Sequence, residues 1–235
     1  NLPDNSKGIF GIVASDEFER DISDPKLPLA WQWNHNPDNN NWDILENPGR
    51  LRITTARVDN NVLLAKNTLT QRTFGPKSTA STLIDISQMK NGDIAGLIAL
   101  QNKYGYVGVK KEDGKNSIVM VESKLDIEGE DEKQGVLAYN DLSTTFKIIE
   151  QVPIDQENVH FRIDCDFDTD KAYFYYSLNG KEWQHIGKPL QMIYAFSKHF
   201  MGYRFGLFNY ATQEAGGYVD FDYYRIDKVP MRKKP

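Results

Sequence analysis

The residues with the clearest capacity for chemistry form an aromatic and amide-rich segment near the start of the chain, WQWNHNPDNNNW at positions 31–42. Trp31 and Trp33 share one face of an extended segment, and the asparagines around Pro37 predict a loop. Indole faces stack on the C–H side of pyranose rings, while amide, imidazole and carboxylate groups supply the hydrogen bonds that sugar hydroxyls need. The segment is therefore a candidate contact for a carbohydrate or a partner domain. In the competing interpretation the tryptophans are core residues and the asparagines only form turns.

A second candidate is the segment NTLTQRTFGP at positions 67–76. Strand alternation places Gln71 and Arg72 on opposite faces, and Gly75-Pro76 ends the strand. Polar residues on both faces are unusual in a strand that only builds a core. We expect this segment to line a surface that something else covers.

Most signatures of catalysis are missing from the sequence. It contains no phosphate-binding loop, no His-Glu-x-x-His and no Gly-x-Ser-x-Gly. Cys165 falls on the apolar face of a predicted strand, where a thiol is inert. Asp166, Asp168 and Asp170 have the opening spacing of a calcium-binding EF-hand loop, but Lys171 stands where the sharp turn requires glycine. This acidic run is interpreted as a solvated hairpin turn.

Paired carboxylates are harder to judge, because glycoside hydrolysis needs only two of them at the correct separation. The chain has 33 acidic residues, which offer many pairings. None stands out in an apolar surrounding that would raise the pKa of a catalytic acid. The sequence leaves a catalytic pair open.

Period-two alternation dominates the chain and predicts about a dozen short strands at intervals of roughly ten residues. The clearest is 158–167, where Val159, Phe161 and Ile163 alternate with polar residues. Asn179-Gly180 predicts a two-residue hairpin turn. The other expected strands are 50–54, 62–74, 79–86, 94–101, 104–110, 116–122, 145–152, 172–176, 183–186, 204–210 and 218–226. Spacing of this kind is typical of an antiparallel sandwich or jelly roll.

Helical signals are scarce, and composition excludes several classes of protein. The segment 193–200 could form a turn or two of helix. A formal net charge of −5 argues against a nucleic-acid partner, and no apolar run approaches the length of a membrane span. One cysteine provides neither an intramolecular disulfide nor a thiolate zinc cage.

The domain organisation is expected to be simple. We predict a lead-in segment at 1–14, a single β-sandwich domain at 15–230 and a solvated basic tail at 231–235. The acidic stretch 124–134 is interpreted as an exposed loop inside the one domain. Because the chain opens with Asn1 and lacks an initiating Met, we treat it as a fragment or a processed product.

Six stretches carry a resemblance to a known family. They are SDEF at 15–18, WQWNHNPDNNNW at 31–42, PGRLR at 48–52, NTLTQRTFGP at 67–76, MKNGDIAGL at 89–97 and YGYVGVKK at 104–111. Together they closely resemble the C-terminal concanavalin A-like domain of family 43 glycoside hydrolases, which are β-xylosidases and α-L-arabinofuranosidases. The resemblance implies an all-β fold, a concanavalin A-like jelly-roll β-sandwich of two antiparallel sheets.

The resemblance also implies a role. In this family an N-terminal five-bladed propeller carries out the chemistry, and the sandwich packs against it and can send a loop toward the active site, for which 71–74 is our candidate. The chain is therefore expected to be a non-catalytic accessory domain of a xylan-degrading enzyme. It would bind xylan or xylo-oligosaccharide, or support the catalytic propeller. The candidate ligand-binding residues are Trp33, His35, Asn36, Gln71, Arg72 and Tyr104.

Related jelly rolls often hold one structural calcium ion between their first and last strands, and the resemblance extends this expectation to the present chain. Asp16 and Asp222 are the candidate ligands, since carboxylates suit a hard cation. Alternation in 218–226 points Val219, Phe221 and Tyr223 inward, with Asp222 and Tyr224 outward.

Two other hypotheses remain open. The chain could itself be a concanavalin A-like hydrolase with a carboxylate pair on the concave sheet, or it could be a structural spacer without a ligand. Because polymer degradation usually takes place outside the cytoplasm, we expect a secreted or periplasmic protein.

Overall fold

Alternation of side chains between two environments produces the strands of this protein. The clearest case is β5 (Lys77–Asp85), in which buried and partly exposed residues alternate at every position. Such a strand buries one face in a core and leaves the other near solvent. By contrast, β6 (Asp93–Leu100) is buried at all eight positions, so both of its faces are covered.

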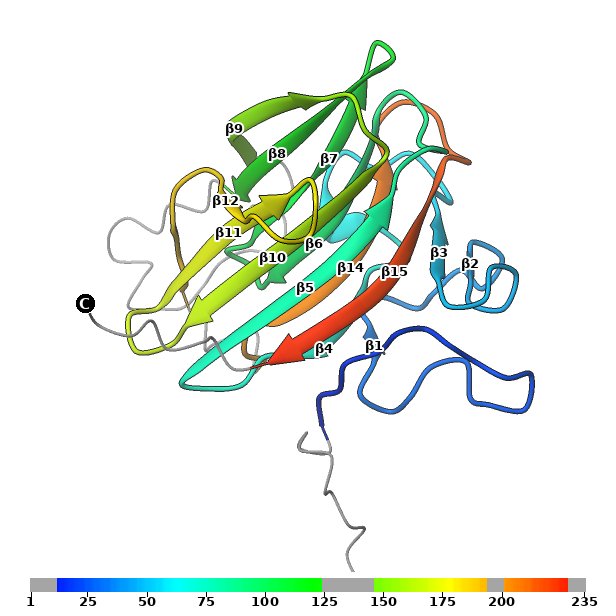
Figure 1. Cartoon of the computed structure of the whole chain (residues 1–235), viewed down its shortest axis with the longest axis horizontal. Helices are drawn as coiled ribbons and strands as arrows, with labels where there is room; N and C mark the ends of the chain where they lie inside the picture. The colour runs from blue at the N-terminus through cyan, green and yellow to red at the C-terminus, as the bar shows by residue number, and fades with distance from the viewer. Residues whose placement is uncertain (1–11, 124–145, 194–200, 228–235) are drawn as a thin grey trace, which may run out of the picture.

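The computed structural model describes residues 12–123, 146–193 and 201–227, which form two stacked sheets (Figure 1). The seven-stranded sheet has the order β1-β4-β14-β6-β7-β8-β9, and the eight-stranded sheet has the order β12-β11-β10-β5-β15-β3-β2, with β13 also paired to β11. All pairings between these strands are antiparallel. The predicted all-β sandwich of two antiparallel sheets is confirmed.

The remaining strands have the following bounds. In the seven-stranded sheet they are β1 (Gln32–Trp33), β4 (Leu69–Arg72), β7 (Gly105–Glu112), β8 (Lys115–Ser123), β9 (Phe146–Ile154) and β14 (Arg204–Ala211). In the eight-stranded sheet they are β2 (Trp42–Asp43), β3 (Leu51–Thr54), β10 (Asn158–Asp166), β11 (Lys171–Ser177), β12 (Gln184–His185), β13 (Leu190–Gln191) and β15 (Tyr218–Asp227).

Two clusters of buried apolar residues pack against the sheets. The larger lies between them and includes Leu97, Phe161 and Phe205, each 0% exposed. The smaller lies on the outer face of the seven-stranded sheet and includes Tyr106 and Phe208. A short 3-10 helix, η1 (Val62–Leu64), contributes Val62 to the smaller cluster and so covers part of this outer face.

The prediction of one strand over 62–74 is wrong. Its first part is η1, and only Leu69–Arg72 forms a strand. Asn61 starts the helical turn, since its side chain accepts a hydrogen bond from the backbone N–H of Leu63. The two-residue hairpin at Asn179-Gly180 is also wrong, because residues 178–183 separate β11 from β12. The Asn179 side chain accepts from the N–H groups of Lys181 and Glu182 and shapes this longer loop.

A β-bulge corrects the predicted facing of the last strand. The register of β15 against β5 shifts between Phe221 and Tyr223, so Asp222 is an extra residue. Beyond it the alternation reverses: Tyr224 is 0% exposed in the core between the sheets, and the Tyr223 hydroxyl lies 3.1 Å from His160 Nδ1 on the outer face.

Other expectations have mixed outcomes. Cys165 is fully buried as predicted, and burial raises its pKa above the usual value. The acidic stretch 124–134, the tail 231–235, most of the lead-in and nearly all of 193–200 lie outside the described residues. Within the described ranges, no helix has the length and apolar character of a membrane span.

Candidate interaction site

The aromatic segment lies where β1 and β2 join the edges of the two sheets. Trp31 is a core residue, 7% exposed, and its indole N–H donates to Asp16 Oδ2 at 2.8 Å. Trp33 is half-buried, and its ring centroid lies 5.1 Å from that of Trp42 at an angle of 55°. Lys26 Nζ lies 5.5 Å from the Trp42 ring centroid. Trp33 and Trp42 therefore form an aromatic pair that is partly open to solvent.

Most of the amides around this pair hold the loop itself. Asn39 Oδ1 accepts from the Trp42 indole N–H at 3.0 Å, and Asn41 Nδ2 donates to Asp38 Oδ2 at 2.9 Å. The Asn67 side chain accepts from the N–H of Asp38 and donates to the carbonyls of Asp38 and Asn41. The turn-forming interpretation therefore accounts for these asparagines.

Two of the predicted ligand-binding residues lie on this loop. His35 Nε2 lies 2.6 Å from the Leu63 carbonyl oxygen, so this nitrogen carries the proton and donates it, fastening the loop to η1. Asn36 is the neighbouring residue and is exposed. The structure thus places Trp33 in β1 and His35 and Asn36 in the loop that follows it, with the His35 ring already bonded to the protein.

Gln71 and Tyr104 are not surface residues in this chain. Gln71 is 1% exposed, and its amide bonds both backbone groups of Ala14: Oε1 accepts from the N–H at 2.9 Å and Nε2 donates to the carbonyl at 2.8 Å. Tyr104 is 1% exposed in the smaller cluster, and its hydroxyl donates to Asn61 Oδ1 at 3.2 Å. Burial raises the pKa of Tyr104 well above its usual value. Neither side chain lies where a sugar could reach it.

Arg72 is exposed at the end of β4, and the structure adds a neighbour that sequence reasoning missed. Its register partner on β14 is Arg204. Arg204 donates to the Gln32 side-chain oxygen and to Thr70 Oγ1, the latter at 3.3 Å. No local pattern signals this pair, because its members are far apart in sequence and meet only through the β4–β14 register.

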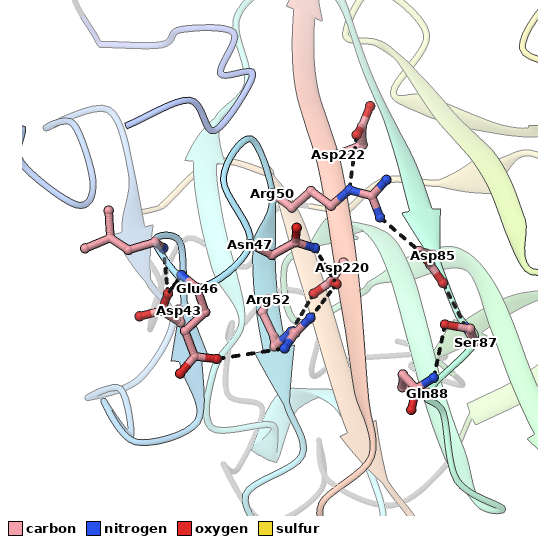
Figure 2. A network of polar contacts seen from close by, with 11 residues as sticks. Asp43, Glu46, Asn47, Arg50, Arg52, Asp85, Ser87, Gln88, Asp220 and Asp222 are labelled. Carbon is pink, nitrogen blue, oxygen red and sulfur yellow. Dashed lines mark hydrogen bonds and ion pairs between the residues drawn. The ribbon is translucent and has the colours of Figure 1, made fainter. Parts of the chain in front are cut away.

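The two proposed calcium ligands have other partners. The Asp16 carboxylate binds Arg20 at 2.5 Å, the Trp31 indole N–H and the Phe18 backbone N–H. Asp222 Oδ1 lies 3.5 Å from Arg50 Nε, and Figure 2 marks this ion pair with a dashed line. Among the described residues, no three His, Cys, Asp or Glu side chains gather as a metal site would require. Hydrogen-bond donors rather than further oxygen ligands surround the Asp16 carboxylate, so the contacts at Asp16 do not suit a calcium ion at the predicted position. Calcium binding by the protein stays a prediction that these contacts do not test.

Several carboxylates do gather on the outer face of the eight-stranded sheet (Figure 2). Arg50 lies between Asp85 and Asp222, at 3.3 and 3.5 Å. Arg52 makes a bidentate contact with Asp220, both bonds being 2.8 Å. The Asp220 contact raises the pKa of Arg52 above its usual value. These acids are held by arginines, and the arrangement resembles a structural ion-pair network more than an acid and base facing a substrate.

A buried carboxyl group lies elsewhere, at the start of β6. Burial raises the pKa of Asp93 to about 6, partly offset by the backbone N–H of Lys90, which donates to Oδ2 at 2.7 Å. A raised pKa is typical of a catalytic acid. However, Asp93 is 0% exposed, so no substrate reaches it in this fold.

Comparisons with known proteins agree with this architecture. The family model described as "Beta xylosidase C-terminal Concanavalin A-like domain" matches residues 15–227. A β-xylosidase from Formosa agariphila is 29% identical over 92% of this chain, which corresponds to 36% of that protein. A putative β-xylosidase from Xylanibacter ruminicola is 26% identical over 81% of this chain and 30% of its own length. The chain thus spans about a third of the length of these relatives.

Solved structures show the same relation. A bifunctional GH43-CE protein from Bacteroides eggerthii is 49% identical, with a TM-score of 0.82, over 93% of this chain and 26% of that one. An engineered GH43 glycoside hydrolase, described as having endo-xylanase and exo-arabinofuranosidase activity, is 30% identical with a TM-score of 0.78. This chain matches 42% of that structure.

Proposed function

This chain belongs to the family of β-xylosidase C-terminal concanavalin A-like domains, and from that membership we propose that it is the non-catalytic C-terminal domain of a family 43 glycoside hydrolase. It supports an N-terminal catalytic propeller that acts on xylan-type substrates. The observation that carries this proposal is the extent of the match. The family model and the sandwich occupy the same residues, up to the end of β15, while the chain is about a third as long as its curated relatives.

The chemistry of the described residues supports a non-catalytic role. The carboxylates on the outer sheet face are bound to Arg50 and Arg52, and Asp93 is enclosed in the sandwich. An inverting or retaining glycosidase needs two carboxyl groups that both face the same sugar. These groups do not meet that requirement.

An activity comparison tests the proposal. The purified 235-residue chain and the longer protein that carries it are each assayed on an aryl xyloside and on xylan. We expect hydrolysis by the longer protein alone. Hydrolysis by the isolated chain, abolished by one Asp or Glu substitution, would establish the rival hypothesis of a stand-alone hydrolase.

Xylo-oligosaccharide binding at the Trp33–Trp42 pair is a second candidate function. The partly exposed indoles, with the exposed Asn36 three residues after Trp33, support it. We expect weak heats in calorimetric titration, as for shallow polar sites. Trp33→Ala should abolish them, whereas Trp183→Ala, a half-buried tryptophan in the loop before β12, should not. No heat at millimolar ligand would leave only the supporting role.

A location outside the cytoplasm follows from the proposed substrate, because xylan is an extracellular polymer. Fractionation of the source cells, with immunodetection of the parent protein, tests this. Recovery with cytoplasmic markers would refute it.

A further inference from the structure

The arginines of this chain divide into two groups. Six of the eight arginines that the structure describes bind a carboxylate: Arg20, Arg50, Arg52, Arg57, Arg162 and Arg225. The other two are Arg72 and Arg204. Within residues 12–123, 146–193 and 201–227, neither has a carboxylate within ion-pair distance.

These two arginines face one another. They are register partners on β4 and β14. Both lie on the outer side of the seven-stranded sheet, because the residues next to them in sequence, Gln71 and Phe205, point inward. Like charges directly opposite on neighbouring strands are unfavourable. Burial and the charge of Arg72 both lower the pKa of Arg204. The neighbours of Arg204 are neutral, so they do not relieve the repulsion.

Arg72 directly follows the residue that holds the first described segment of the chain. Gln71, adjacent to Arg72, binds both backbone groups of Ala14. Ala14 therefore lies against Gln71 of β4, and Figure 1 shows the first described residues, in dark blue, at the end of the sandwich where β1 and β4 are labelled. Met201, which is 43% exposed, lies with its Sδ 3.2 Å from Arg204 Nη2, and Ile12, two residues before Ala14, is 56% exposed. Exposed arginine and methionine are enriched in protein interfaces.

We propose that Arg72 and Arg204 together bind a carboxylate side chain on the surface of the domain that precedes this one in the parent protein. This inference rests on the proposed function, and it identifies the surface by which the sandwich would contact the preceding domain. A guanidinium presents a planar fork of donors that suits a carboxylate, and one carboxylate between two guanidinium groups offsets their mutual repulsion.

The preceding domain is favoured over an acidic sugar as the source of the carboxylate. Both arginines are charged at any working pH, so their repulsion is permanent. A covalently attached domain supplies a permanent counter-charge, whereas a sugar acid would supply one only while bound. The relatives are about three times as long as this chain, and Arg72 is adjacent in sequence to Gln71, which holds the first described segment.

The test compares one substitution in two settings. Arg72→Gln is made in the 235-residue chain and in the longer protein that carries it, and both are followed by calorimetric thermal unfolding. In the chain alone, the melting temperature should stay the same or rise, because repulsion is relieved. In the longer protein it should fall by about 2–4 °C, the shift expected for an ion-pair loss in a domain of this size. Arg204→Gln should repeat this pattern.

Arg225→Gln is the matched control. Arg225 is also on a strand and more than half exposed, but it already binds Glu17 within the chain. Its substitution should change the melting temperature by the same small amount in the 235-residue chain and in the longer protein. A charge reversal, Arg72→Glu, should lower the melting temperature of the longer protein more than Arg72→Gln does.

Each outcome separates the inference from the proposed function. If the wild-type sandwich and the rest of the parent unfold independently, the supporting role itself fails. If they unfold together but Arg72→Gln changes nothing in the longer protein, only the arginine inference is overturned. Salt-sensitive binding of a glucuronic acid-substituted xylo-oligosaccharide to the isolated chain, lost in Arg72→Gln, would overturn it in favour of an acidic sugar.

Discussion

Gln71 and Ala14 are joined by two hydrogen bonds in which a side-chain amide replaces a neighbouring strand. Ala14 N–H donates to Gln71 Oε1 at 2.9 Å, and Gln71 Nε2 donates to the Ala14 carbonyl at 2.8 Å. The amide therefore reproduces the pairing that a β-strand would provide. It explains why a polar side chain in β4 is almost completely buried.

Gln71→Met should destabilise the chain by about 1–3 kcal/mol, since two hydrogen bonds to partly buried backbone groups are lost. Urea unfolding measures this change, and hydrogen exchange at the Ala14 amide should accelerate. The control Gln88→Met alters an exposed glutamine and should stay within about 0.5 kcal/mol of wild type. Equal effects of the two substitutions would refute the role assigned to Gln71.

Asp93 should make stability depend on pH. Because its folded pKa is raised to about 6 from the ordinary 3.8, the native state binds more protons between these values than the unfolded state does. The free energy of unfolding should therefore fall by about 2–3 kcal/mol as pH rises through this window. The charges that act on Asp93 are Lys90, Lys111 and Glu214.

Urea unfolding at pH 4, 5, 6 and 7 tests the Asp93 prediction. Asp93→Asn, which imitates the neutral acid, should remove the part of the pH dependence that Asp93 causes. Asp155→Asn, an exposed control, should leave the slope as in wild type. The prediction fails if Asp93→Asn and wild type lose stability in parallel.

Gly217→Ala should be strongly destabilising, because a Cβ atom there would lie 1.8 Å from Asp93 Oδ2. We expect a loss of about 2–4 kcal/mol, as for other overpacked or strained core sites. At Gly202 nothing lies within 4 Å of an added Cβ, so Gly202→Ala is the control. Thermal unfolding of both variants measures the difference.

A double-mutant cycle identifies the cause of the Gly217 effect. Asp93→Ala removes the carboxylate that the new methyl group would meet. The double variant should therefore be more stable than the sum of the single losses predicts. Simple additivity would place the strain elsewhere, for example in the Lys90 backbone, which also lies close.

Asp220→Ala should cost far more stability than Glu17→Ala. Both acids accept a bidentate bond from an arginine, but the Asp220 side chain is 8% exposed and that of Glu17 is 51% exposed. Removing Asp220 takes away the bidentate contact of Arg52, which lies over the Tyr218 ring, and leaves it the more distant Glu46 at 3.8 Å, with an expected loss of about 2–4 kcal/mol. The exposed pair should contribute about 0–1 kcal/mol. Chemical unfolding that shows equal losses would contradict this ranking.

The strands were predictable wherever alternation was uninterrupted, as in β10 and β5, because a half-buried strand repeats every two residues. Prediction failed where a local hydrogen bond or a register shift intervened. The side chain of Asn61 turns the chain into η1, and the bulge at Asp222 exchanges the environments of Tyr223 and Tyr224. Neither the side-chain hydrogen bond nor the bulge can be recognised in the alternation of apolar and polar residues.

The candidate site shows the same division. The asparagines and Pro37 of 31–42 correctly predicted a loop, but composition could not reveal that the side chains of Asn39, Asn41 and Asn67 bond to the loop itself. Gln71 and Tyr104 were chosen for their chemistry, and only the tertiary structure showed that both side chains are buried.

The sequence by itself determined the class of fold and the family, since alternation and motif content are properties of neighbouring residues. The tertiary structure decided which charged groups meet. Arg72 and Arg204 are separated by most of the chain, and they face each other only because β14 pairs with β4 in one register. A shift of one residue would turn either strand over and separate the guanidinium groups, so the proposed contact surface exists only in the folded sheet.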